Sequence, residues 1–165
     1  YDEVEITDYN TILDLTETRK LDGMLVRLKN VHYTGYYFTT SGSGTAKCTT
    51  GNPEDDTNAN VFAPTTTNIG YPQTRIIEDA EGYKTGISSS EYAKFAHFYL
   101  PGADQNGIDN CKNYVGDVEG ILGFYRDNAT YDPAYDDWSI TIRNLDDLKL
   151  YDANGNLWPR VEYKK

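Results

Sequence analysis

Residues 24–31 set the fold class, because they alternate between apolar and charged side chains: Met24-Leu25-Val26-Arg27-Leu28-Lys29-Asn30-Val31. Met24, Val26 and Leu28 fall on one face, and Arg27 and Lys29 fall on the other. This period of two predicts a half-buried β-strand. The preceding segment, Thr11 to Gly23, combines a Thr11 and Asp14 capping pattern with an apolar side, and it predicts a short helix that ends at Gly23.

Further strands are predicted downstream. An aromatic strand is expected from Tyr33 to Phe38, and a hairpin from Arg75 to Ile87 turns at Ala80-Glu81-Gly82. Val115 to Tyr125 predicts a strand whose glycines, Gly120 and Gly123, mark a bulge or a tight barrel bend. Trp138 to Arg143 alternates as another strand. Leu148 to Tyr151 and Leu157 to Tyr163 predict a last hairpin around Asn154-Gly155.

Two stretches are less regular. Ser41 to Pro72 is rich in Gly, Thr, Asn, Asp and Pro, and it predicts an unusually long, elaborated loop. Ser90 to Leu100 places Tyr92, Phe95, Ala96 and Tyr99 at helical spacing, so it predicts a second short helix, with a strand as the alternative.

Composition points to one acidic, tyrosine-rich domain. The chain has 165 residues, 15 of them tyrosine, and a formal net charge of -11. Such a charge opposes non-specific attraction to nucleic acid or anionic membranes. No apolar run is long enough to span a membrane, so no membrane insertion is expected. The chain starts at Tyr1 rather than Met, which we interpret as trimming.

Cys48 and Cys111 lie in polar, Gly- and Asn-rich stretches rather than in apolar runs. We interpret them as a disulfide, with two unrelated thiols as the alternative. A disulfide implies an oxidising location, either extracellular, at the cell surface or in a periplasm.

The sequence offers no catalytic motif, and we expect no enzyme. His32 and His97 have no metal-ligand spacing, and the glycine run at 41–45 lacks the lysine of a phosphate-binding loop. No cofactor is expected apart from calcium, for which Asp56 is a weak candidate ligand in an incomplete EF-hand-like stretch. Asp132 and Asp136 are equally weak candidates, and solvated acidic loops are the alternative.

Aromatic residues interleaved with Arg or Lys give the strongest functional signal. Stacking rings beside cations bind single-stranded nucleic acid, whereas exposed tyrosines beside acids and amides also suit an oligosaccharide. A third interpretation is that these residues are ordinary strand residues. The candidate ligand-binding residues are Arg27, Lys29, Tyr36, Tyr37, Arg75, Tyr83, Lys84, Tyr125, Arg126, Trp138 and Arg143.

Several motifs resemble a known family. Lys20 to Val31, the hairpin Ile76 to Ile87, the segment Gly116-Asp117-Val118-Glu119-Gly120-Ile121-Leu122-Gly123 and Trp138 to Leu148 look like the OB-fold domain that precedes the catalytic domain of bacterial extracellular nucleases. They are also similar to OB-like modules in Bacteroidetes surface proteins. The resemblance implies an all-β, five-stranded OB-like barrel with long loop insertions and one or two short helices.

On this interpretation residues 1–165 form a single domain. Residues 1–22 lead in, residues 23–150 form the barrel, and residues 151–165 form a hairpin or extension. The resemblance implies a non-catalytic accessory module that binds single-stranded nucleic acid, with an extracellular carbohydrate-binding or adhesion module as the alternative. We expect a monomer or a part of a larger chain.

Overall fold

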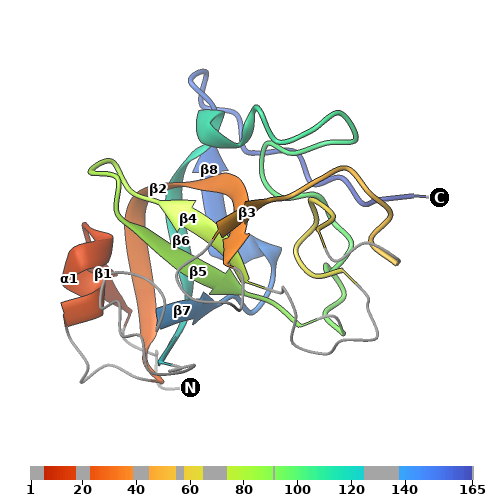
Figure 1. The fold of residues 1–165 in the computed structure, drawn as a ribbon. Coiled ribbons are helices and arrows are strands. Elements are labelled where there is room, and N and C mark those ends of the chain that lie inside the picture. The colour runs from red at the N-terminus through yellow and green to blue at the C-terminus, as the bar shows by residue number, and fades with distance from the viewer. Residues whose placement is uncertain are drawn as a thin grey trace.

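A closed five-stranded barrel forms the centre of the molecule (Figure 1). The computed structural model describes residues 6–17, 23–38, 45–54, 58–64, 74–90, 92–124 and 138–164. Around the barrel the strand order is β2, β4, β5, β7, β6, and pairing of β2 with β6 closes it. The strands are β2 (Leu25–Phe38), β4 (Thr74–Glu78), β5 (Lys84–Ser88), β6 (Val115–Phe124) and β7 (Trp138–Thr141).

The pairing pattern confirms the predicted all-β, OB-like barrel. Counted along the chain, the barrel strands follow one another in space as first, second, third, fifth and fourth. The third and fifth, β5 and β7, are parallel, while the other barrel neighbours are antiparallel. Val118, Leu122 and Ile140 are fully buried inside, as the alternation within β6 and β7 requires.

Strand β2 is longer than predicted, because the segments expected as two strands form one of 14 residues. Its register shifts between Leu28 and Val31 and again between Tyr33 and Tyr37. Asn30 (φ 57°) and Gly35 (φ 79°) lie in these interruptions. Such bulges bend a strand, so β2 pairs with β6 in its first half and with β4 in its second.

The N-terminal helix α1 (Ile12–Glu17) begins where the capping pattern predicts, since Thr11 Oγ1 accepts the Asp14 N–H at 3.1 Å. Ile12 and Leu15 are fully buried, and β1 (Thr7–Tyr9) pairs in parallel with β2. Residues 18–22, the predicted end of the helix, lie outside the described part. No helix in the described ranges is long and apolar enough to cross a membrane.

The predicted hairpin of β4 and β5 is confirmed, and buried Asp79 organises its turn. Asp79 Oδ1 accepts the N–H groups of Glu81 and Tyr83, while its Oδ2 accepts the Ile12 N–H at 2.9 Å. One carboxylate therefore ties the turn to the start of α1.

A layer without long regular elements covers the right-hand side of the barrel in Figure 1. We call residues 45–54, 58–64, 92–114 and 157–164 the lateral layer. It contains β3 (Thr45–Lys47) and the short 3-10 helix η2 (Cys111–Asn113). Phe62 is its centre, since its ring contacts those of Tyr33, Phe95 and Trp158 at centroid distances of 5.5 to 6.2 Å.

The second helix predicted between Ser90 and Leu100 is wrong. The described residues of that stretch form successive turns, with hydrogen bonds from Ala93 to Ser90, Ala96 to Ala93 and Phe98 to Phe95. Turns that repeat every three residues bury Phe95 and Ala96 much as a helix would. The apolar residues therefore do recur at nearly helical spacing, but successive turns, and not a helix, bury them.

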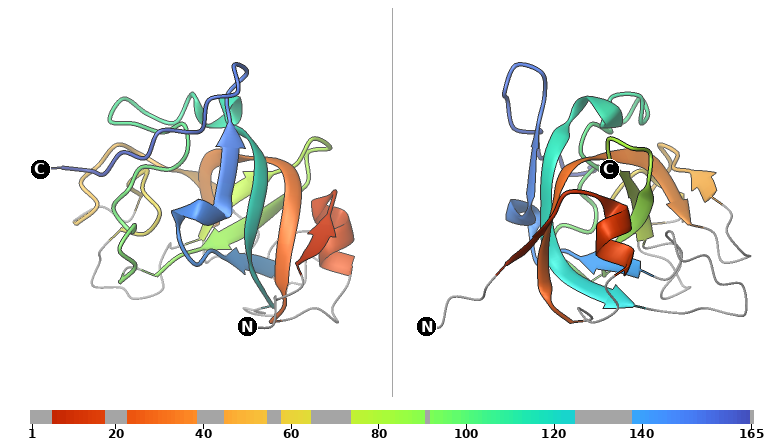
Figure 2. Two further views of the ribbon diagram at one scale, coloured as in Figure 1. Left: turned by 180° about the vertical axis from the view of Figure 1, so that it is seen from behind. Right: turned by 90° about the vertical axis from the view of Figure 1, so that its left-hand side faces the viewer.

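The last predicted hairpin is only partly formed. After η3 (Leu145–Asp147), strand β8 (Leu148–Tyr151) pairs with β6, and the three strands β2, β6 and β8 run side by side in Figure 2. The chain then turns, and Tyr151 bridges to Leu157. Trp158 is 1% exposed and donates its indole N–H to the Leu148 carbonyl. Beyond it the chain leaves β8 and joins the lateral layer.

Candidate ligand-binding surface

Glu119 is the centre of an ion-pair cluster on the outer side of β2, β6 and β8. Its Oε1 accepts the Arg27 Nε–H at 2.9 Å and the Lys149 Nζ–H at 2.8 Å. Arg143 approaches Oε2 at 3.7 Å, and the Glu119 side chain is only 6% exposed. Burial alone would raise the pKa of Glu119, but the hydrogen bonds from Lys149 and Arg27 outweigh it and lower the pKa.

Two further carboxylates complete the cluster. Arg143 forms a bidentate pair with Asp147, at 2.7 and 3.1 Å, which raises the pKa of the guanidinium. Asp8 lies 3.2 Å from Arg27 and 3.9 Å from Lys29. The structure therefore brings together three of the predicted binding residues, Arg27, Lys29 and Arg143, but it places a carboxylate beside each of them.

Arg75 and Tyr37, also predicted as ligand-binding, lie in the interior between the barrel and the lateral layer. The Arg75 guanidinium donates to the carbonyls of Val61 and Ala59 at 3.0 and 3.1 Å, and it lies 5.4 Å from the centre of the Tyr37 ring. Burial lowers the pKa of Arg75. The Tyr37 hydroxyl donates to the Asn58 side-chain oxygen. These two side chains are therefore buried in this structure, where they fasten the lateral layer to the barrel, and ligand contact by them stays a prediction.

The remaining predicted residues are scattered. Tyr36 is 40% exposed on β2, Lys84 is half-buried at the start of β5, and Tyr83 packs against the core. Tyr125 and Arg126 lie outside the described residues, and of Trp138 only the backbone is described. In the described ranges, the predicted residues do not form one groove of aromatic rings and cations.

The calcium and disulfide predictions have different outcomes. Asp56, Asp132 and Asp136 lie outside the described residues, and the described part holds no group of three or more potential metal-ligating His, Cys, Asp or Glu residues. Calcium binding at those three residues stays a prediction. Cys48 and Cys111 are present as thiols, with no bond between their sulfur atoms, so the predicted disulfide is not formed in this structure.

The outer side of β4 and β5 is the face that OB barrels commonly use for ligands. In this chain that side is covered. Ile77 points inward with Tyr33, so its neighbour Ile76 points outward, yet Ile76 is 1% exposed. Gly86, which is paired with Ile76, is buried as well. Ile76 and Gly86 therefore offer no exposed surface on this side of the barrel.

An aromatic surface lies where the C-terminal segment crosses the lateral layer. Residues 97–99 pair antiparallel with residues 161–163, through hydrogen bonds of 2.9 Å from Tyr99 to Val161 and 2.8 Å from Tyr163 to His97. The Tyr99 and Tyr163 rings meet edge to face at 6.5 Å. Burial and the neighbouring Tyr163 raise the pKa of Tyr99, so its hydroxyl is a neutral donor and acceptor at physiological pH.

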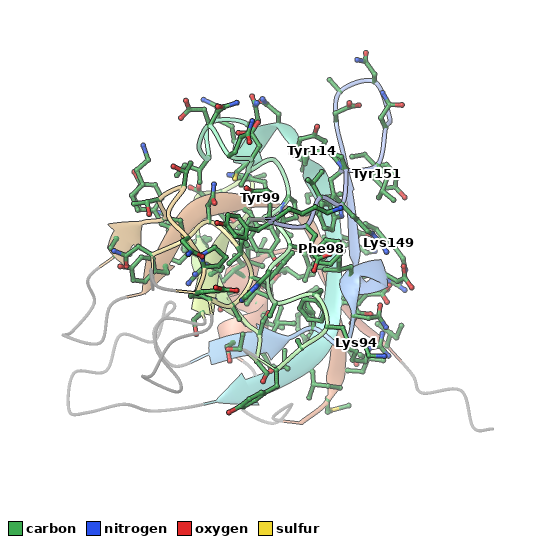
Figure 3. All side chains as sticks on the ribbon, turned by 90° about the vertical axis from the view of Figure 1, so that its right-hand side faces the viewer. Lys94, Phe98, Tyr99, Tyr114, Lys149 and Tyr151 are labelled. Carbon is green, nitrogen blue, oxygen red and sulfur yellow. The ribbon has the colours of Figure 1, made fainter. Side chains whose placement is uncertain are left out.

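Other aromatic side chains lie on the same side of the molecule. Figure 3 shows Phe98, Tyr99, Tyr114 and Tyr151 spread across the side turned to the viewer, with Lys94 and Lys149 at its edge. Tyr151 is 44% exposed, and exposed Val115 and Leu157 pair directly with it. We call Phe98, Tyr99, Tyr114, Tyr151 and Tyr163 the aromatic face. Sequence reasoning missed it, although the high tyrosine content was a signal.

In comparisons with known proteins, no family model, no curated protein and no solved structure matches the chain.

Proposed function

We propose that this chain is a non-catalytic binding module whose OB-like barrel presents the aromatic face to an oligosaccharide. The observation that carries the proposal is a group of partly exposed aromatic side chains beside which Lys149 is already paired with Glu119. Arg27, Lys29, Arg143 and Lys149 are paired with carboxylates, while the tyrosines of the aromatic face remain partly exposed. A tyrosine ring stacks on an apolar surface and its hydroxyl hydrogen-bonds, which suits the faces and hydroxyls of a sugar.

Charge supports a neutral ligand over a phosphate backbone. Four cations in the Glu119 cluster, Arg27, Lys29, Arg143 and Lys149, face three carboxylates, Asp8, Glu119 and Asp147. The whole chain carries -11. A phosphate ligand would have to break these ion pairs and approach against the net charge, whereas a neutral oligosaccharide faces neither cost.

The setting we propose is outside the cytoplasm, at a cell surface or in a periplasm. Polysaccharides are abundant there, and an exported module of this kind would act as an adhesion or substrate-targeting part. This location rests on the sequence and on the proposed ligand class.

Single-stranded nucleic acid is the second candidate, and one observation favours it. Residues 125–137 lie between the fourth and fifth barrel strands in the sequence, and OB folds use the connection at this place for oligonucleotides and oligosaccharides alike. That connection carries Tyr125 and Arg126 and ends at Trp138. A nucleic-acid site on this loop would not use the aromatic face, so the two candidates are separable by mutation.

The experiment pairs an oligosaccharide array with a fluorescent oligo-dT strand of about 20 nucleotides, titrated at low salt. We predict a hit on the array, followed by a loss of about tenfold in affinity on Tyr151→Ala, which corresponds to about 1.4 kcal/mol. Tyr36→Ala is the matched control, because Tyr36 is 40% exposed on β2 beside β3. It should leave the affinity unchanged.

The opposite pattern would reject the proposal. A blank array, together with oligo-dT binding that Tyr151→Ala leaves intact and Trp138→Ala weakens, assigns the module to nucleic acid. Thermal melting of each variant shows whether a lost affinity reflects a lost fold.

A further inference from the structure

The two cysteines lie in one buried cluster, although 63 positions separate them in the sequence. Cys48 follows β3 and is 2% exposed, and Cys111 opens η2 and is 1% exposed. Both belong to the hydrophobic core, in the part formed by the lateral layer. They come from different connections of the barrel, one between β2 and β4 and the other between β5 and β6.

A short chain of contacts through Gly35 joins them. The Cys48 N–H donates to the Gly35 carbonyl at 2.8 Å, and the Cys111 N–H donates to the Ile108 carbonyl at 3.1 Å. Gly35 and Ile108 touch, because a Cβ on Gly35 would lie 2.5 Å from the Ile108 side chain. Gly35 has no side chain, so the segment carrying Cys111 can approach β2 at the point where Cys48 is attached.

The Cys111 thiol is unsuited to chemistry in the folded protein. Burial raises the pKa of Cys111 to about 12, and the nearby Cys48 raises it further. A buried, protonated thiol is a poor nucleophile and a poor metal ligand, so a catalytic or metal-binding role for the pair does not fit. Two buried cysteines whose segments meet through Gly35 and Ile108 do fit a covalent link made during folding.

We propose that Cys48 and Cys111 form a structural disulfide when the chain folds in an oxidising compartment. The oxidant is another disulfide, carried by a thiol oxidoreductase or by oxidised glutathione. A thiolate of one cysteine attacks it to give a mixed disulfide, and the second cysteine then displaces the carrier thiol. One sulfur–sulfur bond forms and one breaks. The two electrons and the two protons pass to the carrier, which leaves as two thiols.

The link would join two segments of the lateral layer, the one that follows β3 and the one that forms η2. This proposal does not rest on the proposed function, since it concerns stability and compartment alone. It also differs from a redox switch, because both sulfur atoms are buried in the folded state.

Peptide mapping of the wild-type protein is the direct test. The chain is exported to a bacterial periplasm, purified without reductant, alkylated with iodoacetamide and digested with trypsin. Cys48 lies in the tryptic peptide 48–75, and Cys111 lies in the peptide 95–112. The proposal predicts these two peptides as one linked species that separates on reduction. Two separate alkylated peptides, or a disulfide-linked dimer on a non-reducing gel, would overturn it.

Thermal melting gives an independent result. Reduction should lower the melting temperature of the wild-type protein by on the order of 10 °C. The Cys48→Ser/Cys111→Ser variant should melt at the temperature of the reduced wild type and should not respond to reductant. An unchanged wild-type melting temperature on full reduction contradicts a stabilising link. Should the variant not fold, peptide mapping of the wild type decides alone.

Discussion

The ion pairs around Glu119 show that the alternation of residues in a strand predicts which face a side chain lies on, but not which partner it meets there. The outward positions of Arg27 and Lys29 were predictable, because the alternation within β2 assigns each side chain to a face. The ion-pair partners of the cations around Glu119 were not predictable from the sequence. Glu119 is 92 positions from Arg27 and 30 from Lys149, and only the register of β2, β6 and β8 brings the three together. Arg27 and Lys29, which are predicted to contact a ligand, therefore form ion pairs within the chain, with Glu119 and Asp8 respectively.

Replacing the buried carboxylate tests this cluster. Glu119→Gln should lower the free energy of unfolding by about 2 kcal/mol at pH 7, because three cations lose their shared partner. The pKa of Glu119 is lower in the folded than in the unfolded state, so its contribution is present above the unfolded pKa and lost as pH falls through the folded pKa. The difference between wild type and variant in urea denaturation should therefore shrink below about pH 4.

The exposed pair of Asp146 and Arg160 is the control for that prediction. Asp146 is 82% exposed, although its hydrogen bond to Arg160 is also 2.8 Å long. Asp146→Asn should change the free energy of unfolding by less than about 0.5 kcal/mol. A change in the free energy of unfolding of the same small size on Glu119→Gln, or one that stays constant down to about pH 3, would contradict a stabilising role of the ionised Glu119 carboxylate.

At the scale of elements, strands were easier to predict than their ends and connections. The β4 and β5 hairpin, β6 and β7 lie where alternation and turn residues predicted them. The sequence did not show that β2 is one continuous strand, because Asn30 and Gly35 suggest turns. In the fold these two residues occupy bulges of a paired strand. Likewise, repeated turns between Ser90 and Phe98 imitate helical spacing, since burial alone sets the apolar pattern.

The two glycines of β6 give a test at this scale, because only one of them is required by packing. A Cβ on Gly120 would lie 2.5 Å from the Ile140 side chain and 2.6 Å from the Thr141 carbonyl oxygen. Gly120→Ala should therefore lower the free energy of unfolding by about 2 to 3 kcal/mol. On Gly123 the nearest atom to a Cβ is 3.8 Å away. Gly123→Ala should be neutral within about 0.5 kcal/mol. Equal effects of the two variants in chemical denaturation would contradict the close packing of Gly120 against β7.

At the scale of the molecule, the barrel was predictable and the candidate site was not. The barrel follows from strand patterns and from motifs that resemble OB folds. The aromatic face depends on the pairing of residues 97–99 with residues 161–163. Neither segment has a strong strand pattern, and the two pair because the lateral layer folds back over the barrel (Figures 1 and 3). Long-range pairing of irregular segments leaves no local signal in a sequence. The charge of the whole chain was readable, and it remains the main argument for a neutral ligand.

We propose binding of the ligand on the aromatic face. Its most direct test is amide chemical-shift mapping of the isotope-labelled protein, titrated with the oligosaccharide that binds best on the array. We predict that the shifts concentrate at residues 97–99, 114, 149–151 and 161–163, and that β4 and β5 stay unchanged. Shifts confined to β4, β5 and the 125–137 connection would contradict the claim.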